Sequence, residues 1–348
     1  MAKQRGPADG TALSTGIVIA AHGRHCVVET PDGAHVICHP RGKKSQSVVG
    51  DRVRWQATED QGTIEKVDPR RNLFYRQDEI RTKSFAANLD QVLILIAAEP
   101  EFSESQLARA LIAAEAERIA PVIALNKSDL GATFDRAWTR LAPYRRMGYN
   151  VVPLALNPKA EEGAGARDSA ADGDMVAPPP KARPALLDGP ATHGGEVDRA
   201  LLQQLLASKT TLVLGPSGAG KSTLINLLVP GALALTREIS QALNSGKHTT
   251  TSTSWYWVDK AAQTALIDSP GFQEFGLHHI EPMQLAKLMP DIAAHATQCK
   301  FYNCSHLHEP GCGVIPQVQT PDNQGGAISA SRYRIYGELF DELSERRY

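Results

Sequence analysis

The stretch LVLGPSGAGKSTLINLL, residues 212–228, reads as a buried strand, a glycine-rich turn and a helix. It contains the pattern G-x-x-x-x-G-K-[ST] in the strand–helix setting that this pattern requires. Its glycines let backbone N–H groups surround phosphate oxygens, while Lys221 suits the β- and γ-phosphates and the Ser222 hydroxyl suits Mg²⁺. The predicted phosphate-binding residues are Gly215, Pro216, Ser217, Gly218, Ala219, Gly220, Lys221, Ser222 and Thr223.

A base-reading element, NKSD at 126–129, comes almost a hundred residues before the phosphate loop. It follows the apolar strand PVIAL, at the carboxyl end where α/β sheets bind ligands. Asp129 could accept hydrogen bonds from guanine N1–H and the exocyclic amine, whereas adenine would leave this carboxylate poorly paired, at a cost on the order of 1–3 kcal/mol. Alone, the four residues also suit a solvated turn. Beside a phosphate loop they predict guanine binding by Asn126, Lys127 and Asp129, and they argue against an ATP-dependent kinase or ATPase.

A third nucleotide element is ALIDSPGF, residues 265–272, in which an apolar strand ends at Asp268. The Asp268 carboxylate could hold Mg²⁺ through water and the Gly271 N–H could contact the γ-phosphate, although the same letters also suit a simple turn. The preceding segment SGKHTTTSTSWYWV, residues 245–258, supplies hydroxyls for the Mg²⁺ shell, and among Thr249, Thr250 and Thr251 we choose Thr250. That segment could equally be only an edge strand.

Three cysteines and a histidine lie close together late in the chain, in the spacing Cys299-x4-Cys304-x-His306-x5-Cys312. Three thiolates and one imidazole suit a closed tetrahedral Zn²⁺ site with no open position, which indicates a structural metal. His308 competes with His306 as the nitrogen ligand. The alternative is a set of unmetallated cysteines in a reducing compartment.

The residue pattern of the N-terminal part predicts a small β-barrel. After a disordered tail at residues 1–14, short alternating segments such as GIVIAA, HCVVET and DRVRWQA are separated by turn residues. We predict an OB-fold RNA-binding domain at 15–80, with a generic five-stranded barrel as the alternative. Cys26 and Cys38 fit small buried side chains of its strands. The basic stretches RGKK and DPRRNLFYRQDEIRTK suit phosphates and stacked bases, or simply a solvated surface.

The central part alternates strands and helices, which predicts a parallel α/β sheet. DQVLILIA reads as a buried strand, and Ser103 is the expected N-cap of the helix that follows it. We place this domain at 81–280 and interpret residues 157–196, rich in Ala, Gly, Pro and Asp, as a disordered insertion. The remaining residues, 281–348, form the predicted zinc-binding α-helical domain.

Bulk properties set further limits. The formal net charge is −1, so any nucleic-acid or anionic-membrane contact must come from local patches. The longest apolar run, VLILIAA, is too short to span a bilayer, and the first residues lack the apolar core of a signal peptide. We therefore expect a soluble cytoplasmic protein without membrane partners. No symmetric interface is evident, and a monomer is the default.

The motif order identifies a resemblance. NKSD first, then the phosphate loop, HTTT and DSPG, with a barrel before and a cysteine cluster after, resembles the RsgA (YjeQ) family of small-ribosomal-subunit biogenesis GTPases over residues 15–348. The resemblance implies a circularly permuted GTPase domain. It also favours His306 as ligand and implies that His248 assists catalysis, since Phe272 stands where many GTPases carry a water-orienting Gln. The segment 154–156 departs from the family's small base-closing stretch, so guanine contacts there stay unassigned.

The resemblance implies a GTPase that acts in late small-subunit assembly, with GTP or GDP, Mg²⁺ and one Zn²⁺ as ligands and with ribosome-stimulated turnover. Its implied partners are the small ribosomal subunit and its rRNA. Two alternatives stay open at this stage. One is a nucleotide-gated rRNA-binding protein in which hydrolysis is incidental. The other is a permuted GTPase of large-subunit assembly.

Overall fold

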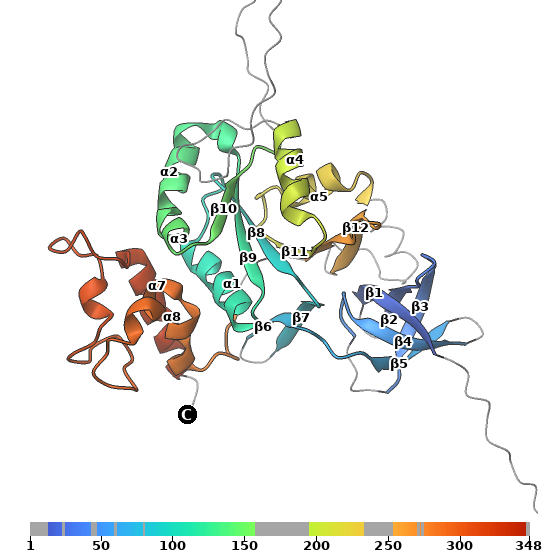
Figure 1. Cartoon of the computed structure of the whole chain (residues 1–348), viewed down its shortest axis with the longest axis horizontal. Helices are drawn as coiled ribbons and strands as arrows, with labels where there is room; N and C mark the ends of the chain where they lie inside the picture. Colours follow the sequence, from blue (N-terminus) through green and yellow to red (C-terminus); the bar gives the residue numbers. More distant parts are fainter. Residues whose placement is uncertain are drawn as a thin grey trace, which may run out of the picture.

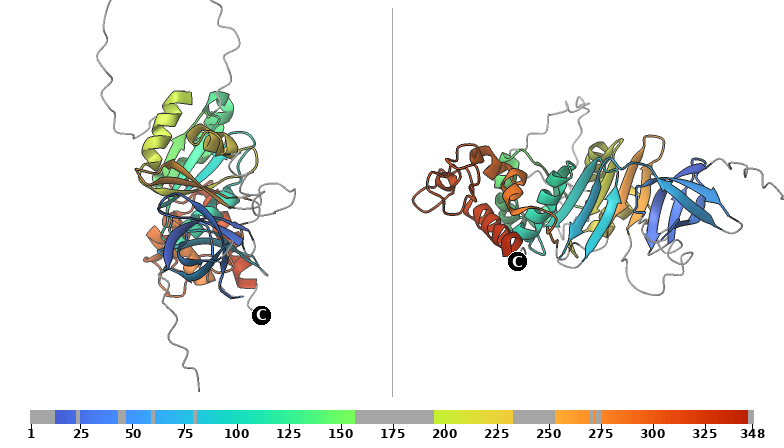
Figure 2. Two further views of the ribbon diagram at one scale, coloured as in Figure 1. Left: turned by 90° about the vertical axis from the view of Figure 1, so that its right-hand side faces the viewer. Right: turned by 90° about the horizontal axis from the view of Figure 1, so that it is seen from below.

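The computed structural model describes residues 13–22, 25–42, 47–58, 61–78, 81–156, 195–232, 253–269, 272 and 275–345. Three parts lie in a row along the longest axis of the molecule, with the barrel at one end, the α/β domain in the middle and the zinc-binding part at the other end (Figure 2). The predicted N-terminal tail and the predicted insertion lie almost entirely outside the described residues.

The N-terminal part is a closed five-stranded barrel. Its strands are β1 (Ser14–His22), β2 (His25–Glu29), β3 (His35–Pro40), β4 (Arg52–Ala57) and β5 (Gly62–Val67). The pairing order β1-β2-β3-β5-β4 closes through β1–β4, and β3 runs parallel to β5. Alternate residues point inward, which produces a core that includes Cys26, Cys38 and Trp55. This Greek-key order confirms the predicted OB-like barrel, with both cysteines buried in it.

The central domain is a six-stranded sheet with helices on both faces, and its strand order is β10-β9-β8-β11-β13-β12. Its strands are β8 (Gln91–Ala97), β9 (Ala120–Asn126), β10 (Asn150–Pro153), β11 (Thr210–Leu214), β12 (Ser254–Asp259) and β13 (Thr264–Asp268). All neighbouring pairs are parallel except β12–β13. Because the chain enters this sheet at β8 and reaches the phosphate-loop strand β11 only later, the order of the elements is that of a permuted domain.

Helices cover both faces of this sheet (Figure 1). They are α1 (Glu104–Ala116), α2 (Ala132–Arg140), α3 (Ala142–Arg146), α4 (Gly195–Leu206) and α5 (Lys221–Leu228). Every residue of β8 is buried: Ile94 and Ile96 share a core with α1, and Leu93 and Leu95 share another with α4 and α5. As predicted, Ser103 caps α1 by accepting a hydrogen bond from the Gln106 N–H.

The barrel and the α/β domain share one sheet, because β1 pairs with β12 at Ala20 and Ser254. A separate hairpin of β6 (Leu73–Gln77) and β7 (Thr82–Ala87) packs near α1. The expected domain limit at residue 80 falls between the two hairpin strands and stays a prediction. Within the described ranges, no helix is long and apolar enough to cross a membrane.

The C-terminal part is built from short helices around one buried ion pair. These are η2 (Pro282–Leu288), α7 (Pro290–Ala296), η3 (Ile315–Gln317) and the longer α8 (Ala330–Ser344). Arg332 of α8 donates from Nε and Nη2 to the Asp291 carboxylate of α7, at 2.9 Å each, and both side chains are almost fully buried. A paired guanidinium can be buried here because each charge satisfies the other.

Candidate functional site: a guanine-nucleotide pocket and a metal centre

The phosphate loop connects β11 to α5 at the carboxyl edge of the sheet, with Gly220 at the N-cap of α5. Gly220 has φ +102°, a conformation that favours glycine, and an added Cβ would overlap the Asn126 amide. A Cβ at Gly215 would likewise overlap the Leu95 carbonyl oxygen. Ser222 and Thr223 are exposed at the start of the helix, while Ala219 is fully buried. The loop backbone therefore lies close against the ends of β8 and β9, where no larger residue would fit.

Asn126 joins the base-reading element to the phosphate loop. Its amide Nδ2 donates to the Ala219 carbonyl at 2.9 Å, and its Oδ1 accepts from the Leu156 N–H at 3.1 Å. Only 4% of Asn126 is exposed, so both contacts form in a low-dielectric setting where they are hard to replace. Lys127 adopts a left-handed conformation and donates to the Glu99 carbonyl. Asp129 lies in the 3₁₀ turn η1 (Ser128–Leu130) that follows.

Asp268 ends β13 beside the phosphate loop. Its carboxylate pairs with the Lys221 ammonium, so the DSPG and GKS motifs are in direct contact. Burial raises the pKa of the Asp268 carboxyl, and the nearby Lys221 charge partly offsets this rise. The next residue, Ser269, donates from its buried hydroxyl to the Val213 carbonyl at 3.0 Å. Three segments distant in sequence thus meet at one edge of the sheet.

Three predicted site residues, His248, Thr250 and Gly271, lie outside the described part of the chain. One residue near the site was missed by sequence reasoning. Asp198 of α4 is fully buried and accepts from the Ala155 N–H at 2.7 Å, which fixes the segment after β10. Its only sequence signal is a carboxylate near the start of an amphipathic helix, and that position is also common for solvated acidic residues.

Segment 154–156 is held at both ends despite its poor match to the expected base-closing stretch. Leu154 N–H donates to Leu125 and its carbonyl accepts from the Ser128 N–H, which ties β10 to the NKSD turn. Leu156 N–H contacts the Asn126 side chain, as described above. The bulky leucines point into the core, since Leu154 and Leu156 are 0% and 7% exposed. The backbone of this segment is therefore ordered beside the base-reading element without small residues.

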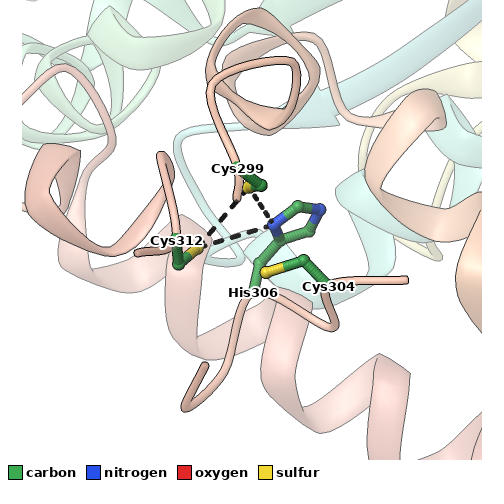
Figure 3. Close-up of side chains that lie close together, drawn as sticks. All are labelled: Cys299, Cys304, His306 and Cys312. Carbon is green, nitrogen blue, oxygen red and sulfur yellow. Dashed lines mark hydrogen bonds between the residues drawn. The ribbon is translucent and has the colours of Figure 1, made fainter. Parts of the chain in front are cut away.

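The metal centre brings together the four predicted ligands Cys299, Cys304, His306 and Cys312 (Figure 3), with all ligand atoms within 4.8 Å of one another. Cys299 Sγ lies 3.9 Å from Cys312 Sγ, and His306 Nδ1 lies 3.3 and 3.6 Å from these two sulfurs. A tetrahedral Zn²⁺ with ordinary bond lengths requires about 3.8 Å between sulfurs and about 3.6 Å between sulfur and nitrogen. The cluster therefore fits one zinc ion.

Surrounding groups hold the ligands in place. The Gly313 and Val314 N–H groups each donate to a cysteine sulfur at 3.3 Å. Tyr333 and Tyr336 of α8 donate to the His306 and Ser305 carbonyls at 2.7 Å. Burial raises the pKa of the Cys304 thiol, so a cation is needed to keep it deprotonated at neutral pH. Such second-layer contacts are typical of structural metal sites.

Comparison with known proteins identifies the family. The RsgA GTPase family model matches residues 67–167 and 192–278, more than half of the chain. The chain belongs to the RsgA GTPase family. A protein of Variovorax paradoxus named small ribosomal subunit biogenesis GTPase RsgA is 68% identical, over 99% of this chain and 98% of its own length. A protein of the same name from Burkholderia pseudomallei is 46% identical over 97% and 95%.

Two solved structures have the same architecture. YjeQ from Thermotoga maritima is 26% identical, covers 96% of this chain and all of its own, and gives a TM-score of 0.66. YloQ, described as a circularly permuted GTPase, is 24% identical, covers 99% of both chains and gives 0.63, a likeness of fold. The predicted family and permutation are therefore confirmed. As an RsgA GTPase, the protein hydrolyses GTP, and its site takes GTP or GDP with Mg²⁺.

Proposed function

We propose that this GTPase binds the small ribosomal subunit, contacts its rRNA and acts late in subunit assembly, with GTP turnover stimulated by the subunit. The observation that carries the proposal is that the Asn126–Ala219 and Lys221–Asp268 contacts bring the three nucleotide motifs together. They do so in a chain that is similar to a named subunit-biogenesis GTPase along almost its whole length. The OB-like barrel and the zinc-binding part flank that site and supply surfaces for RNA. We further propose that it works in the cytoplasm as a monomer.

We propose the following roles at the nucleotide site. Lys221 would move from Asp268 to the β- and γ-phosphates when GTP binds, and Ser222 and Thr250 would supply hydroxyls to Mg²⁺. Asp268 would hold the same ion through water, and the Gly271 N–H would contact the γ-phosphate. The Lys221–Asp268 ion pair supports these roles. When GTP and Mg²⁺ bind, the phosphates would compensate the Lys221 charge and Mg²⁺ would compensate the Asp268 charge.

We assign His248 to positioning or deprotonating the attacking water. Phe272 supports this choice, since it is only 4% exposed and its ring packs 6.0 Å from that of Phe275. An apolar, buried side chain cannot orient water, so a different group must do so. GTP turnover by His248→Ala in the presence of small subunits tests the role. Turnover as fast as that of the parent would remove His248 from the mechanism.

The deciding experiment measures GTP turnover by the zinc-loaded protein with purified small subunits, with large subunits and alone. We expect small subunits to raise the rate strongly and large subunits to leave it near the basal value. Stimulation by large subunits would instead assign the protein to large-subunit assembly. Tight subunit binding with no stimulation would favour a nucleotide-gated RNA-binding protein.

A further inference from the structure

A cavity lies between the barrel and the α/β domain, and no residue of the nucleotide site lines it. Its volume is about 520 Å³, within the roughly 300–1,000 Å³ typical of small-molecule sites. It is bounded by β1 and β4 of the barrel, by the connection after β5 and by β11 and β12 of the GTPase sheet. Its lining residues are Ile17, Gly50, Arg52, Pro69, Arg70, Arg71, Asn88, Asp90, Ser208, Thr210, Trp255, Trp257 and Gln263.

Three arginines line this cavity, and they differ in how far their charges are compensated. Arg70 forms a bidentate pair with the buried Asp51, at 2.7 and 2.9 Å, and so its charge is compensated. Arg71 pairs with Asp90 at 2.7 Å but keeps 58% of its side chain exposed. Arg52 is exposed, and its side chain has no hydrogen bond or ion pair with a residue that the structure describes. Among the described residues, the Arg52 guanidinium thus has no charged partner, and Arg52 lines a cavity that a phosphate could enter.

The same cavity also has an aromatic surface, which the indole ring of Trp257 forms. Trp257 is partly exposed, and its Nε1 donates to both oxygens of Glu29, at 3.0 and 3.2 Å. The ring also meets Trp255 edge-to-face, with centroids 5.1 Å apart. Lys260 pairs with the same Glu29 at 2.6 Å, which fixes the carboxylate. The Trp257 ring is thus held in one orientation, as a stacking surface requires.

The backbone around the cavity is unusual. Six non-glycine residues among those described have positive φ. Lys127 belongs to the NKSD element, His306 to the metal centre and Arg118 to the turn after α1, while Asn88, Ser208 and Gln263 all line this cavity. Asparagine tolerates this conformation, but serine and glutamine adopt it at a cost, and such residues concentrate at functional sites. The cavity shares this property with the two sites already described.

We propose that this cavity binds one nucleotide of a single-stranded RNA, with its phosphate at Arg52 and Arg71 and its base stacked on Trp257. Combined cationic and aromatic surfaces are the usual means of holding single strands. Several lining residues, including Pro69, Ser208 and Gln263, are exposed, so the cavity is open to solvent and a strand can enter it. This inference gives the RNA contact of the proposed function a defined location, and a short RNA tests it without the subunit.

The test uses the full-length, zinc-loaded protein with saturating GDP and Mg²⁺, so that the GTPase site is already filled. A fluorescein-labelled oligouridylate is titrated by anisotropy, and tryptophan emission is followed with the unlabelled oligomer. We expect binding with quenching in the parent. Arg52→Glu and Trp257→Leu should each weaken binding about tenfold, while Trp257→Phe keeps most of it. Arg136→Glu is the charge-matched control on α2, outside the cavity, and should bind as the parent does.

Equal affinity of the parent and Arg52→Glu, or binding without quenching, would overturn the proposal. Uridine 5′-monophosphate and inorganic phosphate serve as competitors. A monophosphate that competes as well as the oligomer would assign the same cavity to free nucleotides and overturn the RNA assignment. Oligomer binding without subunit-stimulated GTP turnover would remove the proposed function and leave this site standing, whereas stimulated turnover without oligomer binding would do the reverse.

Discussion

The metal centre and the nucleotide site are assembled in opposite ways. All four metal ligands come from fourteen consecutive residues, 299–312, and the short loops between them bring the ligand atoms together. The nucleotide site instead joins Asn126, Lys221 and Asp268, which belong to three strand–loop units of one sheet. We expect the first site to depend on a bound ion for its local structure, whereas the second depends on the packing of a whole domain. Perturbing each site should therefore damage different amounts of structure.

Removing a metal ligand should have the largest effect. Cys312→Ser eliminates one of three thiolates, and a structural zinc site typically supplies on the order of 10 kcal/mol to the segment that it folds. We expect less than one zinc per chain by atomic emission and rapid proteolysis after residue 281, with the barrel and GTPase domain intact. Cys26→Ser is the control, because Cys26 is buried in the barrel far from the ligands in sequence. Full zinc content in Cys312→Ser would contradict the ligand assignment.

The next test concerns the segment between the two sites. Phe275 follows the DSPG motif and is 2% exposed, with its ring 5.6 Å from Phe74 and stacked at 6.0 Å on Phe85 of the β6–β7 hairpin. Phe275→Ala should lower the free energy of unfolding by about 3–5 kcal/mol, since it opens a cavity among these rings. Urea unfolding measures this loss. Phe301→Ala, at a 42% exposed phenylalanine, should change stability by less than about 0.5 kcal/mol.

The difference between the two sites also explains what sequence could predict. The cysteine spacing, the Ser103 cap and the two-sided burial of β8 are local or periodic signals, and the structure contains all three. The Asn126–Ala219 bond spans 93 positions and the Ala155–Asp198 bond spans 43, and no pattern along the chain encodes either partner. The β1–β12 pairing that joins barrel to GTPase sheet is of the same long-range kind. Motifs therefore predicted the candidate residues, and only the fold supplied their contacts.

Asn126 tests the long-range type of assembly directly. Asn126→Ala leaves the Ala219 carbonyl and the Leu156 N–H buried without their partner, which should cost about 2–3 kcal/mol of stability and weaken GDP binding at least tenfold. Urea unfolding and calorimetric GDP titration measure the two effects. Ser128→Ala, two residues away, is the matched control: its buried hydroxyl has no hydrogen-bond partner among the described residues. If both variants lose GDP affinity equally, the Asn126 contacts are not what orders the site.

The smallest expected effect is a pH dependence at the junction between the two sites. His279 packs against Tyr75 with ring centroids 4.5 Å apart, and burial, followed by the neighbouring His278, lowers its pKa to about 4 from the usual 6.5. Because the folded state favours the neutral ring, the stability that it provides is complete above pH 6.5 and is lost as the pH falls towards 4. His279→Phe keeps a ring but cannot titrate. Between pH 7 and pH 5, the unfolding free energy of this variant should therefore fall by about 1 kcal/mol less than that of the parent, after a discount for solvent screening. Both proteins have the same zinc ligands, so comparing them at both pH values cancels the effect of protonating those ligands. Equal losses of unfolding free energy in the two proteins would show that His279 is solvated in the folded state.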